Sequence, residues 1–261
     1  SQAYLATNTR FGWLTEATQL SAVLVFWFAG GFPALDAWVR SHDWGPVLSG
    51  LLFIGFLVGI RAILSLPFSV YQTFVIEEKF GFNRTSWQTF VTDRLKGLVL
   101  VGVLGAPLLA GILFFFENAG PQAWLYSLGV VAVYMVVMPY VAPTWIMPLF
   151  NRFEPLPDSH LENAIRTYAR SIGFPLEKVF VMDGSRRTGK GNAFFAGFGR
   201  HKRIVLFDTL VAQHDQEELL AILAHEMGHY KRHHIVMGLA AGLFQVGVMF
   251  YLLSLCISHP A

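Results

Sequence analysis

Five stretches of this chain are apolar and carry almost no charge, and they constrain the fold more than any other feature. A helix needs about 20 apolar residues to cross the hydrocarbon core of a bilayer. One stretch contains Arg61, and the first is the weakest because Gly30, Gly31 and Pro33 interrupt it. A large soluble core with buried helices would require fewer such runs. We therefore predict a mostly α, polytopic transmembrane helical bundle with spans within residues 17–35, 44–76, 97–116, 118–151 and 235–258.

The composition agrees with a lipid environment around much of the surface. Only 14% of the 261 residues are charged, and the mean hydropathy is +0.49. Soluble domains usually carry about a quarter charged residues. The formal net charge of +2 is too small to indicate a nucleic-acid partner. The lone Cys256 excludes an intrachain disulfide and a multi-cysteine zinc site.

The basic residues predict the orientation of the spans. Five spans place residues 1–16, 77–96 and 152–234 on one side of the membrane, and that side holds 17 of the 19 Lys and Arg. Basic loops favour the cytoplasmic side. We therefore expect a multi-pass integral membrane protein with segment 152–234 in the cytoplasm, in a bacterial inner membrane or the endoplasmic reticulum.

Arg61 is the one basic residue inside a predicted span. An intramembrane guanidinium is costly unless it is paired, faces a wet cavity or snorkels to the interface. A polar chamber between helices and a snorkelling side chain both account for Arg61. A transporter would require paired intramembrane charges, which makes that class a weaker alternative.

Residues 152–234 read as a small α+β domain inserted before the last span. A helix at 158–171 is followed by strand patterns at 179–182, 192–198 and 203–207. A long helix then begins near Gln216, where Asp215 and Glu218 have the spacing of a capping box. No stop signal precedes residue 255, so one uninterrupted helix is predicted. The predicted domains are 1–151 with four spans, 152–234 with the site, and 235–261 with the fifth span.

The sequence His225-Glu226-Met227-Gly228-His229 lies on that helix. Histidines four positions apart share a helical face, about 40° apart around the axis, so both imidazoles can bind one Zn²⁺. Glu226 can take a proton from the attacking water and pass it to the leaving amine. The pattern therefore predicts a zinc metallopeptidase with His225 and His229 as metal ligands and Glu226 as the catalytic base. Ordinary histidines on a polar helix face near the membrane are the alternative.

A third metal ligand is not evident in the sequence. Metzincins place a third histidine where this chain has Ile235, so that class is excluded. We interpret His233 and His234 as neighbours of the site or interfacial residues rather than ligands. The remaining expectation is a carboxylate from a later helix, but residues 230–261 contain no Asp or Glu.

Asn192, Ala193 and Phe194 open a segment of small and aromatic residues. Such a segment suits an edge strand that binds a peptide substrate through main-chain hydrogen bonds. An ordinary aromatic hairpin strand is the alternative.

Beyond the zinc motif, the chain resembles the type-1 CaaX prenyl protease family of integral-membrane gluzincins. The resemblance implies a large chamber within seven membrane helices, with the zinc site at its cytoplasmic-side wall, and Asn192 and Ala193 on the substrate strand. It lies in segments spread in order along nearly the whole chain, at residues 9–12, 75–83, 148–156, 181–185, 192–194, 203–208 and 225–229.

The resemblance also implies the reaction. Such enzymes remove the C-terminal tripeptide of prenylated CaaX proteins or degrade membrane proteins, so the expected partners are a peptide or protein substrate, possibly prenylated, and the lipid bilayer. The chain resembles spans two to six of the family, as if truncated at both ends, and the family's third ligand is a Glu beyond the matching region. The alternative is a catalytically incomplete membrane scaffold or pseudo-protease.

Overall fold

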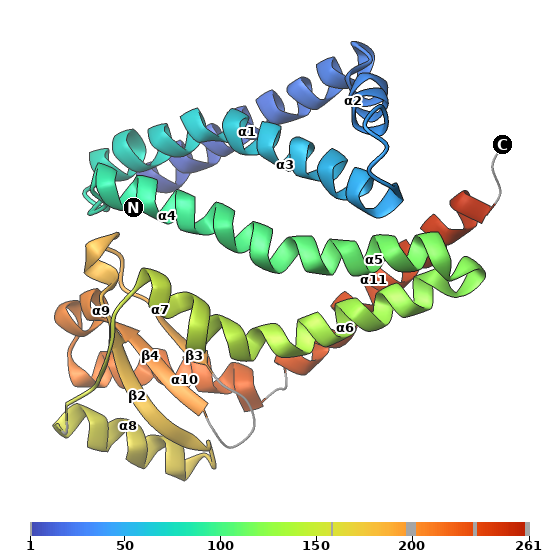
Figure 1. Ribbon diagram of the computed structural model, residues 1–261. Helices are drawn as coiled ribbons and strands as arrows, with labels where there is room; N and C mark the ends of the chain where they lie inside the picture. Colours follow the sequence, from blue (N-terminus) through green and yellow to red (C-terminus); the bar gives the residue numbers. More distant parts are fainter. Residues whose placement is uncertain (1, 158, 197–201, 232–233, 259–261) are drawn as a thin grey trace. The chain divides into compact units, whose positions relative to one another are not determined.

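The computed structural model is built mainly from helices and contains one four-stranded sheet (Figure 1). It describes residues 2–157, 159–196, 202–231 and 234–258. The chain forms two compact units, residues 1–83 with 97–120 and residues 84–96 with 121–261. This architecture confirms the predicted fold class. The domain ranges 1–151, 152–234 and 235–261 stay predictions.

Four helical segments are long and apolar enough to cross a membrane, and a bent pair gives a fifth candidate. The surfaces of these candidate spans are apolar. For example, Phe28, Trp145 and Phe244 are 85%, 77% and 75% exposed. Exposure on this scale requires an apolar solvent. The multi-pass membrane character is thereby confirmed. The four segments are Pro46–Glu77, Trp87–Asn118, Gly120–Phe150 and Val236–Ile257.

The first unit starts with the bent pair. Helices α1 (Gln2–Phe28) and α2 (Gly31–Arg40) meet at 64°, and Gly30 between them has a φ of +74°, which favours glycine. This bend explains why the first predicted span was the weakest. The unit continues with the helical elements α3 (Pro46–Tyr71), η1 (Gln72–Glu77), the end of α4 (Trp87–Leu100), η2 (Val101–Gly105) and α5 (Ala106–Asn118).

The start of α1 lies beside the end of α3 and η1. The Tyr4 hydroxyl donates to the Glu77 carboxylate at 2.5 Å, and the Gln72 amide donates to Asn8 at 2.7 Å. These bonds place residues 1–16 and the segment that follows η1 at the same end of the unit.

Arg61 is exposed on α3 and lines a cavity of about 500 Å³ together with Glu16 of α1. Apolar residues form most of the remaining wall, among them Leu57 and Phe26. Of the two interpretations of Arg61, the cavity between helices is the one that this arrangement favours.

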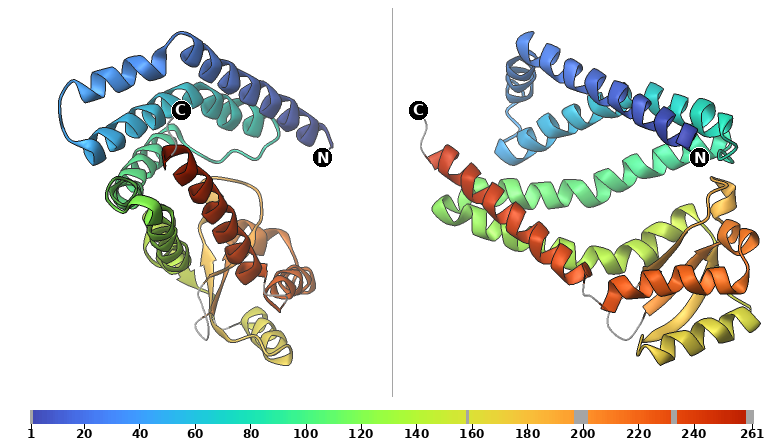
Figure 2. Two further views of the ribbon diagram at one scale, coloured as in Figure 1. Left: turned by 90° about the vertical axis from the view of Figure 1, so that its right-hand side faces the viewer. Right: turned by 180° about the vertical axis from the view of Figure 1, so that it is seen from behind.

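In the second unit, α6 (Ala123–Val141) and α11 (His234–Ser258) pack against each other (Figure 2). Small residues permit the close approach, because a Cβ added at Gly242 would lie 2.9 Å from the Met135 side chain. Trp124 and Tyr251 meet edge to face with ring centroids 5.5 Å apart. The span of α6 begins with η3 (Gly120–Gln122) and ends through η4 (Ala142–Ile146) and α7 (Met147–Phe150).

The sheet belongs to the second unit and has the strand order β1-β2-β4-β3. β2 and β4 are parallel, and the two outer pairs are antiparallel. Helices α8 (His160–Ser171) and α10 (Gln216–Lys231) cover one face, and α9 (Asp208–Gln213) follows β4. The strands are β1 (Phe153–Pro155), β2 (Leu176–Met182), β3 (Ala193–Ala196) and β4 (Lys202–Phe207).

Short elements are where the structure differs from the sequence-based expectation. β1 has three residues and α9 has six, which is too few for a periodic pattern to reveal them. The predicted strand at 192–198 is β3, and residues 197 and 198 lie outside the described residues.

The single long helix expected from Gln216 is instead two helices. α10 ends at Lys231 and α11 begins at His234, with residues 232 and 233 outside the described part. Figure 2 shows that the two helix axes point in different directions. The change of direction has a packing reason, because α10 contacts the sheet whereas α11 contacts α6.

Candidate metal centre and substrate edge

Helix α10 carries the candidate metal ligands, and its start is capped as predicted. The Glu218 N–H donates to the Asp215 carboxylate at 2.9 Å, and the Asp215 N–H donates to the Glu218 carboxylate at 3.3 Å. These reciprocal bonds form a capping box, which satisfies two backbone donors that a helix end leaves free. The cap fixes the residue at which α10 starts and hence the rotation of every later side chain about its axis.

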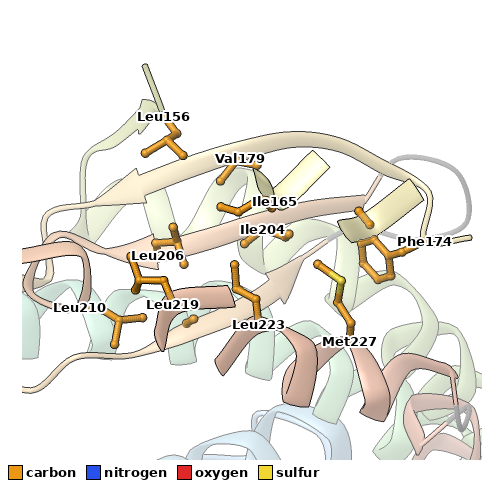
Figure 3. Close-up of a cluster of buried hydrophobic side chains, with 12 residues drawn as sticks. Leu156, Ile165, Phe174, Val179, Ile204, Leu206, Leu210, Leu219, Leu223 and Met227 are labelled. Carbon is orange, nitrogen blue, oxygen red and sulfur yellow. The ribbon is translucent and has the colours of Figure 1, made fainter. Parts of the chain in front are cut away.

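One face of α10 is buried against the sheet (Figure 3). Leu219, Leu223 and Met227 are each no more than 2% exposed and contact the same apolar cluster as Ile204 and Leu206 of β4. Because a helix turns 100° per residue, a position two residues from Leu223 and from Met227 faces away from the sheet. His225 is that position, and it is exposed.

The backbone of residues 225–229 is helical throughout. His229 follows His225 by four residues, about 6 Å along the axis, and therefore shares its outward face. The side chains of Glu226 and His229 lie outside the described residues. Histidines four residues apart on a helix are a donor pair that zinc prefers, so the helical backbone of residues 225–229 fits a metal site. Among the described side chains, no group of three His, Cys, Asp or Glu converges on a point.

Gly228 leaves room on α10. A Cβ added there would meet nothing within 4 Å, so packing does not require this glycine. Glycine inside a helix costs about 1 kcal/mol relative to alanine. The open space lies one residue from His229.

β3 is the terminal strand of the sheet, and α10 contacts it. The Phe207 N–H donates to the Asn192 carbonyl at 2.9 Å, which sets the hydrogen-bond phase of the pairing with β4. By the alternation of antiparallel strands, Phe194 turns its main-chain groups toward β4, whereas Ala193 and Phe195 turn theirs toward the open edge. The side-chain oxygen of Asn192 accepts from the outward Ala193 N–H at 2.9 Å.

The side chains of the same strand anchor it in the sheet. Ala193 is 7% exposed, and Phe195 packs against Phe174 with ring centroids 5.1 Å apart. On the opposite face, Phe194 meets Phe207 edge to face at 6.4 Å. The aromatic residues that suggested a substrate strand therefore hold β3 in place, and its main chain is what the edge presents.

The turn before β3, residues 183–191, depends on Arg187, which sequence reasoning did not single out. Its guanidinium donates to both carboxylate oxygens of Asp93 at 2.7 and 3.0 Å, and to Asn151 and the Phe150 carbonyl, each at 2.7 Å. Its own carbonyl accepts from the Arg84 N–H at 3.1 Å. Arg187 thus ties the turn to the start of α4 and the end of α7. No sequence signal pairs it with residues so far along the chain.

Two glycines let this turn pack closely. A Cβ at Gly184 would lie 2.3 Å from the Phe207 ring, and one at Gly191 would lie 3.1 Å from the Leu210 backbone. Asp208 holds the turn from the other side by accepting from the Ser185 N–H at 2.8 Å. Contacts from three separate segments therefore hold the turn at residues 183–191 that precedes β3.

Comparison with known proteins assigns both parts of the chain. Residues 1–152 match the family model described as CAAX prenyl protease N-terminal, five membrane helices, and residues 155–260 match that of peptidase family M48. CAAX prenyl protease 1 homolog of Oryza sativa subsp. japonica is 37% identical over 251 residues, which cover 92% of this chain and 59% of that protein. CAAX prenyl protease 1 of Saccharomyces cerevisiae is 37% identical over 249 residues, with shares of 90% and 54%.

A solved structure has the same architecture. The crystal structure of S. mikatae Ste24p is 36% identical, has a TM-score of 0.90, and is matched over 97% of this chain and 60% of that one. The chain therefore spans little more than half the length of these relatives.

Proposed function

This chain belongs to peptidase family M48, and from that membership we propose that it is a membrane-embedded zinc metalloendopeptidase. The observation that carries the proposal is the helical 225–229 segment, which is capped at its start and buried along the opposite face. His225, on the other side of α10, is exposed rather than part of the core. The family supports a metal in general, and the pair of imidazoles favours zinc.

The substrate class follows from the relatives. CAAX prenyl protease 1 of Saccharomyces cerevisiae and its homolog in Oryza sativa match 90% and 92% of this chain. We propose that the chain removes the C-terminal tripeptide of prenylated CaaX proteins. The membrane spans suit such a substrate because the prenyl group resides in the bilayer. Degradation of membrane proteins is the broader activity that the same site could perform.

In the proposed mechanism, His225 and His229 hold the metal and Glu226 moves the proton. Zinc bound by these residues would supply a Lewis acid for the scissile carbonyl and for the attacking water. Glu226, next to His225 on the helix, takes a proton from the attacking water and delivers it to the leaving amine. The burial of Leu223 and Met227 fixes the rotation of α10 and therefore the backbone positions of residues 225 and 229 on it.

The free edge of β3 is proposed to hold the substrate as an additional strand. The outward main-chain groups there are the Ala193 carbonyl and both groups of Phe195. The outward Ala193 N–H already donates to Asn192, and the Asn192 amide nitrogen, which has no assigned acceptor among the described residues, can donate in its place. Main-chain bonding of this kind orients a peptide with little demand on its side chains. Of the residues predicted from sequence, Asn192 and Ala193 suit this role. Phe194 turns its main-chain groups toward β4 and packs its ring against Phe207.

We also propose that residues 152–234 lie in the cytoplasm. Basic residues concentrate in this segment and in 77–96, and cytoplasmic loops favour such residues. Addition of a membrane-impermeant thiol reagent to single-cysteine variants at Lys178 and at Asp43 would test the sidedness, with Cys256 replaced by serine.

The test of the activity is Glu226→Gln in the full chain, with Glu217→Gln on the same helix as the matched control. Cleavage of a farnesylated CaaX peptide should fall at least about 100-fold for Glu226→Gln, because general acid–base catalysis contributes 10²–10⁴-fold. Bound zinc should stay near one per chain. Full activity of Glu226→Gln would contradict its role.

Metal analysis separates the enzyme from the alternative, a catalytically incomplete membrane scaffold. The enzyme binds about one zinc per chain and loses it on His225→Ala. A folded chain without zinc would favour the scaffold, which the lack of Asp and Glu in residues 230–261 also supports.

A further inference from the structure

A second pocket of about 480 Å³ lies in the second unit, on the face of the sheet opposite to α10. The end of the α6 span and strands β1, β2 and β4 line it. Its charged side chains are Arg152, Glu154 and Arg203, beside Asn151 and the ring of Phe180. The zinc motif and the β3 edge contribute none of the lining, so an inference about this pocket does not rest on the proposed peptidase activity.

Arg203 is held half-buried in this pocket by its strand. Val205, two residues along on the same face, is 3% exposed, and the Arg203 guanidinium lies 5.9 Å from the centroid of the Phe180 ring. Within the described part of the chain, this guanidinium forms no hydrogen bond and no ion pair. A partly desolvated cation without an ion-pair partner is unfavourable, so Arg203 favours an anion in the pocket.

Arg152 provides a second cation from the end of the span. Its backbone N–H donates to the Asp183 carboxylate at 2.8 Å, which fixes the main chain at the pocket rim. The exposed Arg152 side chain has no ion-pair partner in the ranges that the structure describes. Next to it, the Asn151 side-chain oxygen is occupied by Arg187 at 2.7 Å, so Asn151 has its amide N–H groups left to donate.

The pocket lies at the end of a candidate membrane span. The candidate span Gly120–Phe150 ends directly before Asn151 and Arg152. Lys96 donates to the Leu149 carbonyl at 2.6 Å and adds positive charge at this end of the span. Basic pockets at this level of a membrane protein bind anionic lipid headgroups.

The charge of the lining indicates which phosphate it suits. Two guanidinium groups and the Glu154 carboxylate leave one net positive charge, which matches a singly charged phosphodiester better than a doubly charged monoester. Guanidinium groups bind phosphate oxygens in pairs of parallel hydrogen bonds. We propose that this pocket binds the phosphodiester headgroup of an anionic membrane lipid through Arg203 and Arg152.

The test compares the full chain with Arg152→Gln/Arg203→Gln in nanodiscs of phosphatidylcholine with or without phosphatidylglycerol. Retained phosphatidylglycerol is counted by native mass spectrometry. Arg170→Gln/Arg186→Gln is the control, because both arginines are exposed in the same unit, do not line the pocket and change the net charge equally. The pocket variant should lose phosphatidylglycerol affinity at least about tenfold, since hydrogen bonds to charged groups are worth roughly 1.5–3 kcal/mol each. The control should stay within twofold of the unmodified chain.

If the double variant does not fold, the single variant Arg152→Gln replaces it, because an exposed side chain can be changed without loss of folding. Its phosphatidylglycerol affinity should fall at least about threefold. Equal lipid affinity of the pocket and control variants would overturn the proposal. If the pocket binds inorganic phosphate but not phosphatidylglycerol, its ligand is free phosphate and the lipid proposal is wrong. A peptide with a free C-terminal carboxylate that binds there in place of either phosphate would instead assign the pocket to substrate.

Discussion

Replacement of Arg187 by alanine should loosen the turn that leads into β3. The change removes four hydrogen bonds at once, two of them to the Asp93 carboxylate. Loss of one partner of a fully buried ion pair costs about 3–5 kcal/mol. The Arg187 and Asp93 side chains are 22% and 24% exposed, so water screens part of this interaction. We expect a cost of about 2–4 kcal/mol in the local opening free energy of residues 183–191.

Hydrogen exchange measured by mass spectrometry reports this opening directly. The Arg84 N–H, which donates to the Arg187 carbonyl, and the Thr188 N–H, which donates to Gly184, are the reporter amides. A cost of 2–4 kcal/mol corresponds to exchange roughly 30- to 1,000-fold faster. Arg186→Ala is the matched control, because the Arg186 side chain adjoins Arg187 in sequence, is exposed and has no assigned bond within the described residues. This control should change the exchange rate less than about threefold.

A double-mutant cycle with Asp93→Asn isolates the pair itself. The coupling free energy should be roughly 1–3 kcal/mol, because charge-assisted bidentate bonds are the strong class. Equal exchange in the Arg187→Ala and Arg186→Ala variants, or a coupling near zero, would refute the reasoning. Arg187→Lys should recover only part of the loss, since lysine lacks the planar fork.

Further predictions concern α10 and the sheet. Leu223→Ala should lower the unfolding free energy by about 2–5 kcal/mol in chemical denaturation, because the side chain is 1% exposed. Asp215→Ala should cost about 1 kcal/mol and speed exchange in the first turn of α10, whereas Asp215→Asn should not. Gly228→Ala should add up to about 1 kcal/mol of stability, and a loss of peptide cleavage despite that gain would show that substrate uses the open space. Burial lowers the pKa of Lys202 from 10.5 to about 8. Between these two values the unfolded chain binds more protons than the folded chain, so the unfolding free energy should rise from pH 8 to 10.5. Lys202→Met should abolish that slope in chemical denaturation.

Features that depend on neighbouring residues could be predicted from the sequence. The Asp215 and Glu218 cap needs only a spacing of three and was found at the correct position. The zinc motif needs only helical periodicity, and its backbone is helical as expected, whereas its role as a metal site stays a prediction. The edge position of β3 was also anticipated, because small and aromatic residues mark such strands. Which main-chain groups of that edge point outward could not be predicted, because the pairing of Asn192 with Phe207 across the strands decides it.

Hydropathy along the chain therefore determined the membrane spans, and residue spacing determined the helix that carries residues 225–229, because both are properties of short contiguous segments. Tertiary structure alone decided that Arg187 joins Asp93 and Asn151, which lie 94 and 36 residues away. It also decided that Arg152 and Arg203 share one pocket. A one-dimensional pattern carries no information on which distant side chains meet, since that depends on how the packed elements close around the core.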